Sequence, residues 1–293
     1  MSAIITKAIF PVGGLGTRFL PATKSMPKEM LPVVDKPLIQ YAVEEAAEAG
    51  ITEFIFVTGR GKTAIEDHFD HSTEIEDTLE KRGKDDGLTA VRGMMKPPGS
   101  VAYIRQQEPA GLGHAIWCAR HYTNGEPVAV LLADDLIQPD KGGVGCLKQM
   151  VAAWQETGGN MVAAMDVPKE KTASYGIITP GVVDGALTEV KGLIEKPHPD
   201  DAPSTLAVVG RYILEPGVFD ELEKMERGTG GEIQITDSLA RRIGHVPFFS
   251  HQFSGTRFDC GSKLGFLQAN ISYALSRDDL AGRLEPWLKS LNQ

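Results

Sequence analysis

The sequence predicts an α/β fold in which a mainly parallel mixed sheet lies between two layers of helices. Two observations support this prediction. Short apolar runs alternate along the chain with segments whose apolar residues recur at helical spacing, and this order is typical of a parallel sheet with helices on both faces. In addition, a chain of 293 residues that is 42% apolar can bury a full core.

The first half of the chain shows the alternation most clearly. Residues 8–12 form a continuous apolar run, as expected for a strand that is covered on both faces. After Pro37, apolar residues such as Leu38 and Val43 share one helical face, and the glutamates, Glu45 included, fall on the opposite face. We interpret residues 84–100, which are rich in Gly, Pro and Asp, as an inserted loop. Further strands are expected at residues 54–58, 101–106, 128–133 and 161–167, and helices at 62–69, 73–82, 111–122 and 147–154.

The pattern changes after Ser174, where strand-like segments follow one another over short loops. This change indicates an antiparallel or mixed extension of the sheet. The expected strands lie at residues 176–179, 187–194, 206–214, 246–250 and 256–258, and the expected helices at 216–225, 233–243, 263–276 and 278–291.

Composition excludes several classes of protein. The chain has 39 acidic and 30 basic residues and a net charge of −9, which argues against general nucleic-acid binding. No segment approaches the roughly 20 consecutive apolar residues of a membrane span, and residues 1–6 lack the features of a signal peptide. The three cysteines, Cys118, Cys146 and Cys260, have no close pairing and indicate reduced thiols. We therefore expect a cytoplasmic protein with neither nucleic acid nor membrane as a partner.

A glycine-rich turn follows the first predicted strand. Such a turn exposes backbone N–H groups, and cations close behind it suit the phosphates of a nucleotide. A dinucleotide-binding motif is not complete, because Phe19 stands where the third glycine would be, and no P-loop follows. The turn and the proline-rich loop behind it contain Gly13, Gly14, Gly16, Arg18, Lys24 and Lys28.

Acidic residues follow other strands. Asp134 and Asp135 end the most apolar predicted strand, where two adjacent carboxylates repel each other unless a cation neutralises them. Mg²⁺ is commonly bound by one or two carboxylates together with substrate phosphates, so we favour a metal ligand at Asp134 and a turn cap at Asp135. Asp259 is a second acid at a strand end. Glu195 and Lys196, read by spacing alone, are a solvated surface pair.

Longer motifs resemble the sugar-1-phosphate nucleotidylyltransferases, and within them the bacterial UTP–glucose-1-phosphate uridylyltransferases. The resemblance extends from about Lys7 to Ala274. It implies a Rossmann-like three-layer fold of the nucleotidyltransferase (GT-A-like) type. The matching segments are 13–18 (GGLGTR), 27–33 (PKEMLPV), 111–115 (GLGHA), 132–135 (LADD), 175–176 (YG), 195–197 (EKP) and 257–261 (RFDCG).

The resemblance also implies roles for single residues. For the nucleotide base, it implies that the uracil is held by the backbone of Val12, Gly13 and Gly14 and by the side chain of Gln106, with Gly111 beside it. It also implies that Glu29 helps to fix the uridine, and that Arg18 and Lys28 contact the phosphates. For the sugar phosphate, it implies contacts from Gly176 and Glu195 to the glucose hydroxyls, from Lys196 to the phosphate, and from Val208 in the sugar pocket. For Mg²⁺, it implies the ligands Asp134 and Asp259.

The activity implied by the resemblance is the synthesis of UDP-glucose and pyrophosphate from UTP and glucose 1-phosphate. The sugar phosphate would attack the α-phosphorus of UTP in line with the leaving group, and Arg18, Lys28 and Lys196 would be the catalytic cations. The expected catalytic domain is 1–262, with a nucleotide half at about 1–170 and a sugar-binding half at about 171–262. Residues 263–293 would form helices for packing or for assembly into a homotetramer or dimer.

Two alternatives remain open from the sequence. The same chemistry could use dTTP or another sugar 1-phosphate, because a glutamine at position 106 can pair with uracil or with thymine. A paralogue without activity could instead bind a sugar nucleotide and regulate a partner enzyme. Retention of the charged residues, among them Arg18, Lys28 and Asp259, argues against the second alternative.

Overall fold

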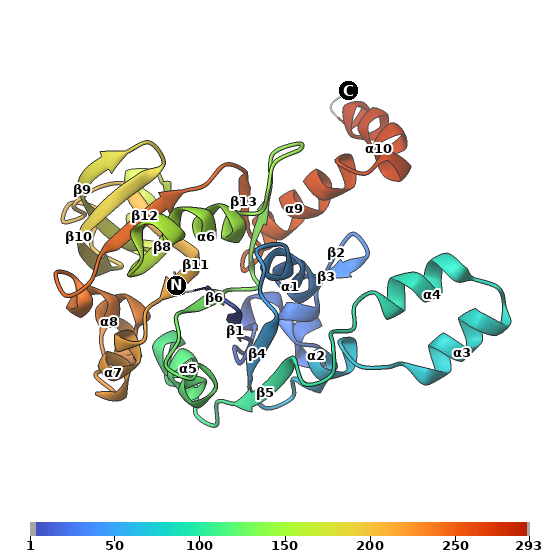
Figure 1. Ribbon diagram of the computed structural model, residues 1–293. Coiled ribbons are helices and arrows are strands. Elements are labelled where there is room, and N and C mark those ends of the chain that lie inside the picture. Colours follow the sequence, from blue (N-terminus) through green and yellow to red (C-terminus); the bar gives the residue numbers. More distant parts are fainter. Residues whose placement is uncertain (1–3, 292–293) are drawn as a thin grey trace.

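The computed structural model describes residues 4–291 and has a nine-stranded sheet as its central layer (Figure 1). Parallel pairing joins β5 to β4, β4 to β1, β1 to β6, and β8 to β12, whereas β10 and β11 run antiparallel to their neighbours. Across the sheet the order is β5 (Val101–Arg105), β4 (Glu53–Thr58), β1 (Lys7–Pro11), β6 (Val128–Leu131), β11 (Leu206–Leu214), β8 (Asn160–Asp166), β12 (Phe248–Gln252), β10 (Leu187–Glu195) and β9 (Gly176–Asp184).

Helices cover both faces of the sheet. The side chains of β1 alternate between the two faces, since Ala8 and Phe10 join one apolar cluster and Ile9 joins the other. The first cluster includes α1 (Leu38–Glu48) and α6 (Cys146–Thr157), and the second includes α5 (Leu112–Cys118), α7 (Gly217–Glu223) and α8 (Ile235–Arg242). The predicted three-layer α/β fold is therefore confirmed. The sheet runs through both predicted halves of the catalytic domain, and their boundary stays a prediction.

The remaining elements surround this core. α9 (Lys263–Leu275) packs through Phe266, Ala269 and Tyr273 on a smaller cluster with Val33 and Phe258. Within residues 4–291, no helix combines the length and the apolar composition needed to cross a bilayer. The strands outside the main sheet form two-stranded ribbons, one of β2 (Pro32–Val33) with β3 (Lys36–Pro37) and one of β7 (Asp135–Gln138) with β13 (Thr256–Asp259). The helices that surround the core are α2 (Thr63–His68), α3 (Thr73–Lys81), α4 (Asp85–Arg92), α9 (Lys263–Leu275) and α10 (Asp278–Ser290).

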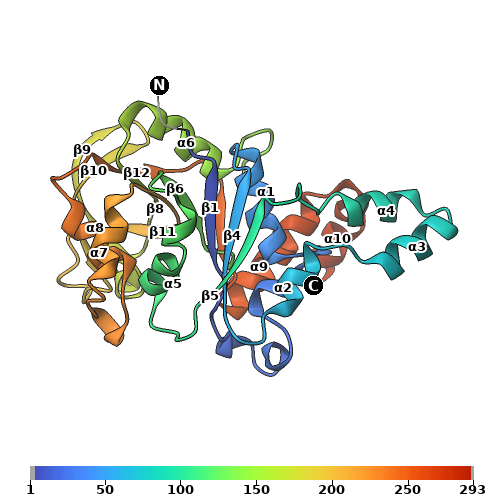
Figure 2. The same ribbon diagram turned by 60° about the horizontal axis from the view of Figure 1, so that its bottom comes forward.

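The interpretation of residues 84–100 as a loop is wrong, because α4 lies within them. α3 and α4 form an arm that projects from the body of the molecule, as Figures 1 and 2 show. Gly87, which suggested a loop, is helical, and an ideal Cβ there would come within 3.2 Å of Leu79 Cδ2. The glycine therefore allows the two helices of the arm to approach each other closely.

Glu45 also departs from the expectation of an exposed polar face. Its carboxylate accepts hydrogen bonds from Arg211 on β11, at 3.0 Å from Nε and 2.7 Å from Nη2. The Arg211 side chain is 1% exposed, and its Nη1 also donates to the backbone oxygen of Leu132 at 3.1 Å. A guanidinium at this depth requires a carboxylate partner. The pair thus connects α1 to β11 and to the segment that leads to Asp134.

We expect Glu45→Ala to lower the free energy of unfolding by about 3–5 kcal/mol, because it leaves the Arg211 charge buried and unpaired. Glu44→Ala is the matched control: Glu44 pairs with Lys36 at the surface, and such pairs contribute about 0–1 kcal/mol. Urea unfolding followed by circular dichroism measures both. Equal losses in the two variants would contradict a structural role for the Glu45–Arg211 pair.

Candidate active site

Two neighbouring cavities open along the edge of the sheet where β1, β5 and β6 end. The first, of about 630 Å³, is lined by the loops that follow these three strands. The second, of about 500 Å³, is lined by residues of β9, β10, β11 and α8. Five residues line both cavities and so mark their junction: Arg18, Leu112, Leu132, Asp134 and Glu232. Segments 13–18, 106–111 and 134–135, each of which follows a strand, meet at these two cavities.

The junction carries opposite charges. Lys28 Nζ lies 2.5 Å from Asp134 Oδ2. Burial alone would lower the pKa of the Lys28 ammonium, but the Asp134 and Glu29 carboxylates raise it above its usual value. Burial would likewise raise the pKa of Asp134, but the Lys28 charge holds it below its usual value. Both groups are therefore charged near neutral pH.

The first cavity contains most of the residues predicted for the nucleotide. Gly13, Gly14, Gln106 and Gly111 line it together with Arg18 and Lys28. Gly111 has φ of +114°, and an ideal Cβ there would come within 2.7 Å of the backbone oxygen of Ile233. Only glycine avoids both the strained backbone and this contact.

Two residues predicted for the nucleotide do not line either cavity. The Val12 side chain is fully buried in the core, and its N–H donates to the Val57 oxygen at 2.9 Å. Glu29 is 1% exposed and accepts a hydrogen bond from Lys62 Nζ at 2.7 Å. Its burial raises the pKa of the Glu29 carboxyl, and Lys62 opposes that rise. In this structure Glu29 holds the loop in place, and its contact with uridine stays a prediction.

The two predicted metal ligands lie close to each other. The Cys260 N–H donates to the Asp134 backbone oxygen at 2.8 Å, which brings the chain around Asp259 beside Asp134. An ideal Cβ on Gly261 would lie 3.0 Å from Asp259 Oδ1, 3.1 Å from Asp134 Oδ2 and 3.2 Å from Arg18 Nη1. The glycine therefore leaves room where both carboxylates converge.

This donor set fits Mg²⁺. Carboxylate oxygens are its preferred protein ligands, and it usually takes one or two of them together with phosphate and water. Within residues 4–291, no group of three or more His, Cys, Asp or Glu side chains could hold a metal ion by itself. Such a site would therefore be completed by a phosphate-bearing substrate.

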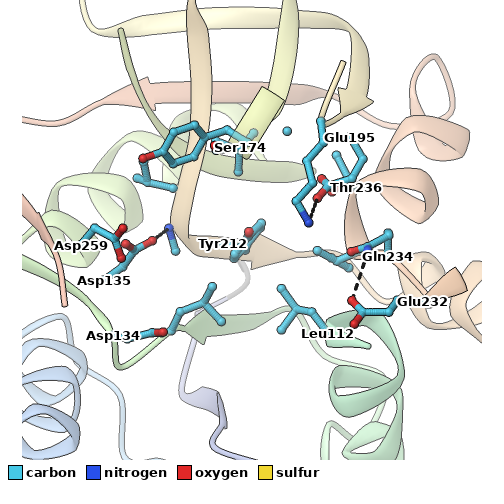
Figure 3. Close-up of a pocket in the computed structure, with 18 of the residues that line it drawn as sticks. Leu112, Asp134, Asp135, Ser174, Glu195, Tyr212, Glu232, Gln234, Thr236 and Asp259 are labelled. Carbon is cyan, nitrogen blue, oxygen red and sulfur yellow. Dashed lines mark hydrogen bonds and ion pairs between the residues drawn. The ribbon is translucent and has the colours of Figure 1, made fainter. Parts of the chain in front are cut away.

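Asp135 has a different role from its neighbour. Its Oδ1 pairs with Arg257 on β13, with Arg257 Nε at 2.8 Å, and its Oδ2 accepts the Gly210 N–H at 2.7 Å. Arg257 also donates to the Tyr175 hydroxyl at 2.9 Å. Instead of the predicted turn cap, Asp135 joins the β7–β13 ribbon to β11, while Figure 3 shows it next to Asp134 and Asp259.

The second cavity contains every residue predicted for the sugar phosphate, namely Gly176, Glu195, Lys196 and Val208. Glu195 Oε1 lies 3.2 Å from Lys196 Nζ, and Glu195 Oε2 accepts a hydrogen bond from the Thr236 hydroxyl at 2.6 Å. The Lys196 side chain is 43% exposed and the Glu195 side chain only 10%, so the pair is not simply a solvated one. Figure 3 shows Glu195 and Thr236 facing the cavity opposite the three aspartates.

Several lining residues were not found from the sequence. Thr236 and Gln234 come from α8 and the turn before it, and Tyr212 from the middle of β11. The only local signal was the alternation of polar and apolar residues in segment 232–236 (EIQIT), which overlaps the start of the predicted helix. Tyr212 lies in a strand that is buried along its whole length, and it carries no such signal.

Comparison with known proteins agrees with this geometry. The pattern of the nucleotidyl transferase family matches residues 7–275. A UTP–glucose-1-phosphate uridylyltransferase from Komagataeibacter xylinus is 53% identical over 260 residues, 89% of this chain and 90% of that protein. The solved structure of a UDP-glucose pyrophosphorylase complexed with UDP-glucose has a TM-score of 0.84 and 42% identity, and covers 94% of this chain and 100% of its own.

A second solved structure, UTP-bound UDP-glucose pyrophosphorylase from Acinetobacter baumannii, has a TM-score of 0.90 and 39% identity, with 98% of this chain and 100% of that chain covered. The likeness thus extends over almost the whole length of the proteins compared. It also confirms the family that the sequence motifs indicated. The chain belongs to the nucleotidyl transferase family, in the group of UTP–glucose-1-phosphate uridylyltransferases.

Proposed function

We propose that the protein makes UDP-glucose and pyrophosphate from UTP and glucose 1-phosphate. The observation that carries this proposal is the pair of cavities that meet at Arg18 and Asp134. A reaction between two phosphate compounds needs two binding sites with a shared wall, and the charged groups must lie at that wall. The relatives named above act on, or bind, these same compounds.

The reaction is an in-line displacement at phosphorus. A phosphate oxygen of glucose 1-phosphate forms a bond to the α-phosphorus of UTP, and the bond from this phosphorus to the bridging oxygen breaks. The electron pair of that bond leaves with pyrophosphate. The second pKa of a phosphate monoester is about 6, so the nucleophile is already ionised at neutral pH and needs no general base. This agrees with a junction of cations and carboxylates without a catalytic histidine.

The main physical obstacle is repulsion between the two substrates. Two unit charges at ~4 Å repel by about 4 kcal/mol at an effective dielectric constant near 20. Arg18 and Lys28 on the nucleotide side and Lys196 on the sugar side would offset this repulsion and hold the reacting atoms in line. Glu195 would accept hydrogen bonds from sugar hydroxyls, with its second oxygen held by Thr236.

Asp134 and Asp259 would hold Mg²⁺ together with the phosphates of UTP. The bound ion would neutralise phosphate charge and stabilise the charge that develops on the leaving group. In the structure, Lys28 Nζ forms an ion pair with Asp134 Oδ2. A divalent cation would therefore compete with the Lys28 ammonium for Asp134, and Lys28, once displaced, would be available to the phosphates.

Location in the cytoplasm and assembly into a homodimer or homotetramer remain predictions. Supporting assembly, one face of α9 carries a stripe of exposed apolar side chains at helical spacing, Leu264, Leu267, Ile271 and Leu275. A stripe of this kind is usually covered in the assembled protein. A second copy of the chain is the partner that we propose for it.

A coupled assay that measures pyrophosphate release from UTP and glucose 1-phosphate, run with and without Mg²⁺, tests the proposed activity. We expect release that depends on both substrates and on the metal. A parallel panel of dTTP and CTP, and of galactose 1-phosphate, tests the alternative substrates. A protein that binds UTP but releases no pyrophosphate under any of these conditions would be the regulatory paralogue.

Lys28→Ala should lower kcat by about 10²–10³-fold, the range found when one donor that stabilises transition-state charge is removed. Lys24→Ala is the matched control, because Lys24 lies in the same loop, is exposed and lines neither cavity. Steady-state kinetics at saturating substrates measure both. Near-wild-type kcat in Lys28→Ala would remove Lys28 from the catalytic cations.

Metal binding to the free enzyme gives an independent readout. Lys28→Ala frees Asp134 from its ion pair and should bind Mg²⁺ more tightly than the wild type, whereas Asp134→Asn should bind it more weakly. Isothermal titration calorimetry without nucleotide measures the three dissociation constants. If the three constants were equal, Asp134 would not be a ligand and the competition would not exist.

A further inference from the structure

A chain of hydrogen bonds behind the first cavity holds the side chain of Gln106. Gln106 Nε2 lies 3.2 Å from the Gly111 backbone oxygen and 3.0 Å from His114 Nδ1. His114 lies on α5, one turn after Gly111, and its Nε2 is 4.0 Å from Cys118 Sγ on the next turn. Gln106 itself is 9% exposed and lines the cavity.

The chemistry of these groups defines the orientation of the amide. A backbone carbonyl can only accept, so the amide atom beside the Gly111 oxygen must be the nitrogen. The same oxygen also accepts the Ala115 N–H at 3.1 Å in the first turn of α5, which fixes its position. The second proton of the Gln106 amide then points to His114 Nδ1. This ring nitrogen must be the acceptor, so the His114 proton is on Nε2, towards the Cys118 sulfur.

The imidazole is itself held in place. It stacks on the Trp117 indole, with ring centroids 5.8 Å apart and an angle of 20° between the planes. The Arg120 guanidinium lies 3.5 Å from the centroid of the same indole. His114 therefore presents its acceptor nitrogen in one orientation.

With both amide protons engaged, the Gln106 oxygen faces the glycine-rich turn. An ideal Cβ on Gly13 would lie 3.1 Å from Gln106 Oε1, so this oxygen lies against the turn that lines the same cavity. An oxygen in this place accepts from the N3–H of uracil or thymine. It repels cytosine, whose N3 is an acceptor as well. If the amide turned over, its NH₂ group would face the base and favour cytosine instead.

We propose that His114 is a positioning residue for base selection: it holds the Gln106 amide so that an acceptor faces the base, and thereby favours UTP over CTP. The proposal rests on the proposed function, since it assigns the first cavity to the nucleotide base. His114 is not among the residues that line the two cavities, and it would act through Gln106. Without His114, the Gly111 oxygen alone would hold the amide.

The test compares kcat/KM for UTP and CTP in three variants of His114. His114→Leu keeps bulk but removes the acceptor, and His114→Ala is a second variant without one. We expect the UTP-to-CTP ratio of kcat/KM to fall roughly tenfold in both, the effect of one lost hydrogen bond. His114→Asn places an amide oxygen near the position of Nδ1 and should restore the ratio. The matched control is His121→Ala, an exposed histidine beyond the end of α5, which should leave the ratio unchanged.

The ratio separates positioning from a loss of folding, because a smaller fraction of folded enzyme lowers both values of kcat/KM equally. A wild-type ratio in both His114→Leu and His114→Ala would overturn the proposal, as would an Asn variant that loses the ratio as fully as Leu. A wild-type enzyme that forms no UDP-glucose from UTP would instead refute the proposed function. The two failures are therefore distinguishable.

Discussion

The site depends on how two adjacent carboxylates after β6 are neutralised. Neighbouring acids in a partly buried position repel each other, and each needs a cation of its own. Asp135 turns towards Arg257 and becomes part of the framework, while Asp134 faces the cavities and pairs with Lys28. The Arg257 side chain is 9% exposed and also donates to the Tyr175 hydroxyl, so its pair with Asp135 belongs to the framework of the site. Lys28 lies in a short 3₁₀ helix of the proline-rich loop, and in the proposed reaction its pair with Asp134 would open when the substrates supply other charges. The end of β6 thus combines a structural ion pair, Asp135–Arg257, with a second pair, Asp134–Lys28, that we propose to open during the reaction.

Close packing of the backbone makes the two-cavity arrangement possible. The loop before α5 pairs with the segment before α8, where the Ile233 N–H donates to the Ala110 oxygen and the Gly113 N–H donates to the Ile233 oxygen, both at 2.8 Å. These bonds join the walls of the two cavities next to Glu232, a residue that lines both cavities. Gly261 allows similar closeness on the opposite wall.

Much of the fold could be predicted because its central strands are buried on both faces. The apolar run of β11 was predicted with the observed bounds, and β1 and β6 within one or two residues at each end. Local patterns failed where the structure depends on distant partners. Glu45 looked exposed because its partner, Arg211, is 166 residues away. The motifs identified most of the residues that line the cavities. They identified neither the Glu29–Lys62 pair nor Thr236, because local spacing does not reveal ion pairs and hydrogen bonds between separate segments.

The α3–α4 arm has a practical consequence. It leaves the body between α2 and β5 and projects from one side of the molecule (Figures 1 and 2), and no residue of α3 or α4 is among those that line the two cavities. Its tip is a short turn at Gly83, which has a φ of +62°. Gly83 is exposed to solvent, and an ideal Cβ there would meet no atom within 4 Å. The tip therefore offers an attachment point for a fluorescent reporter or an immobilisation tag, at a distance from the reacting groups. An enzyme tethered there would keep its cleft open to the substrates that diffuse to it.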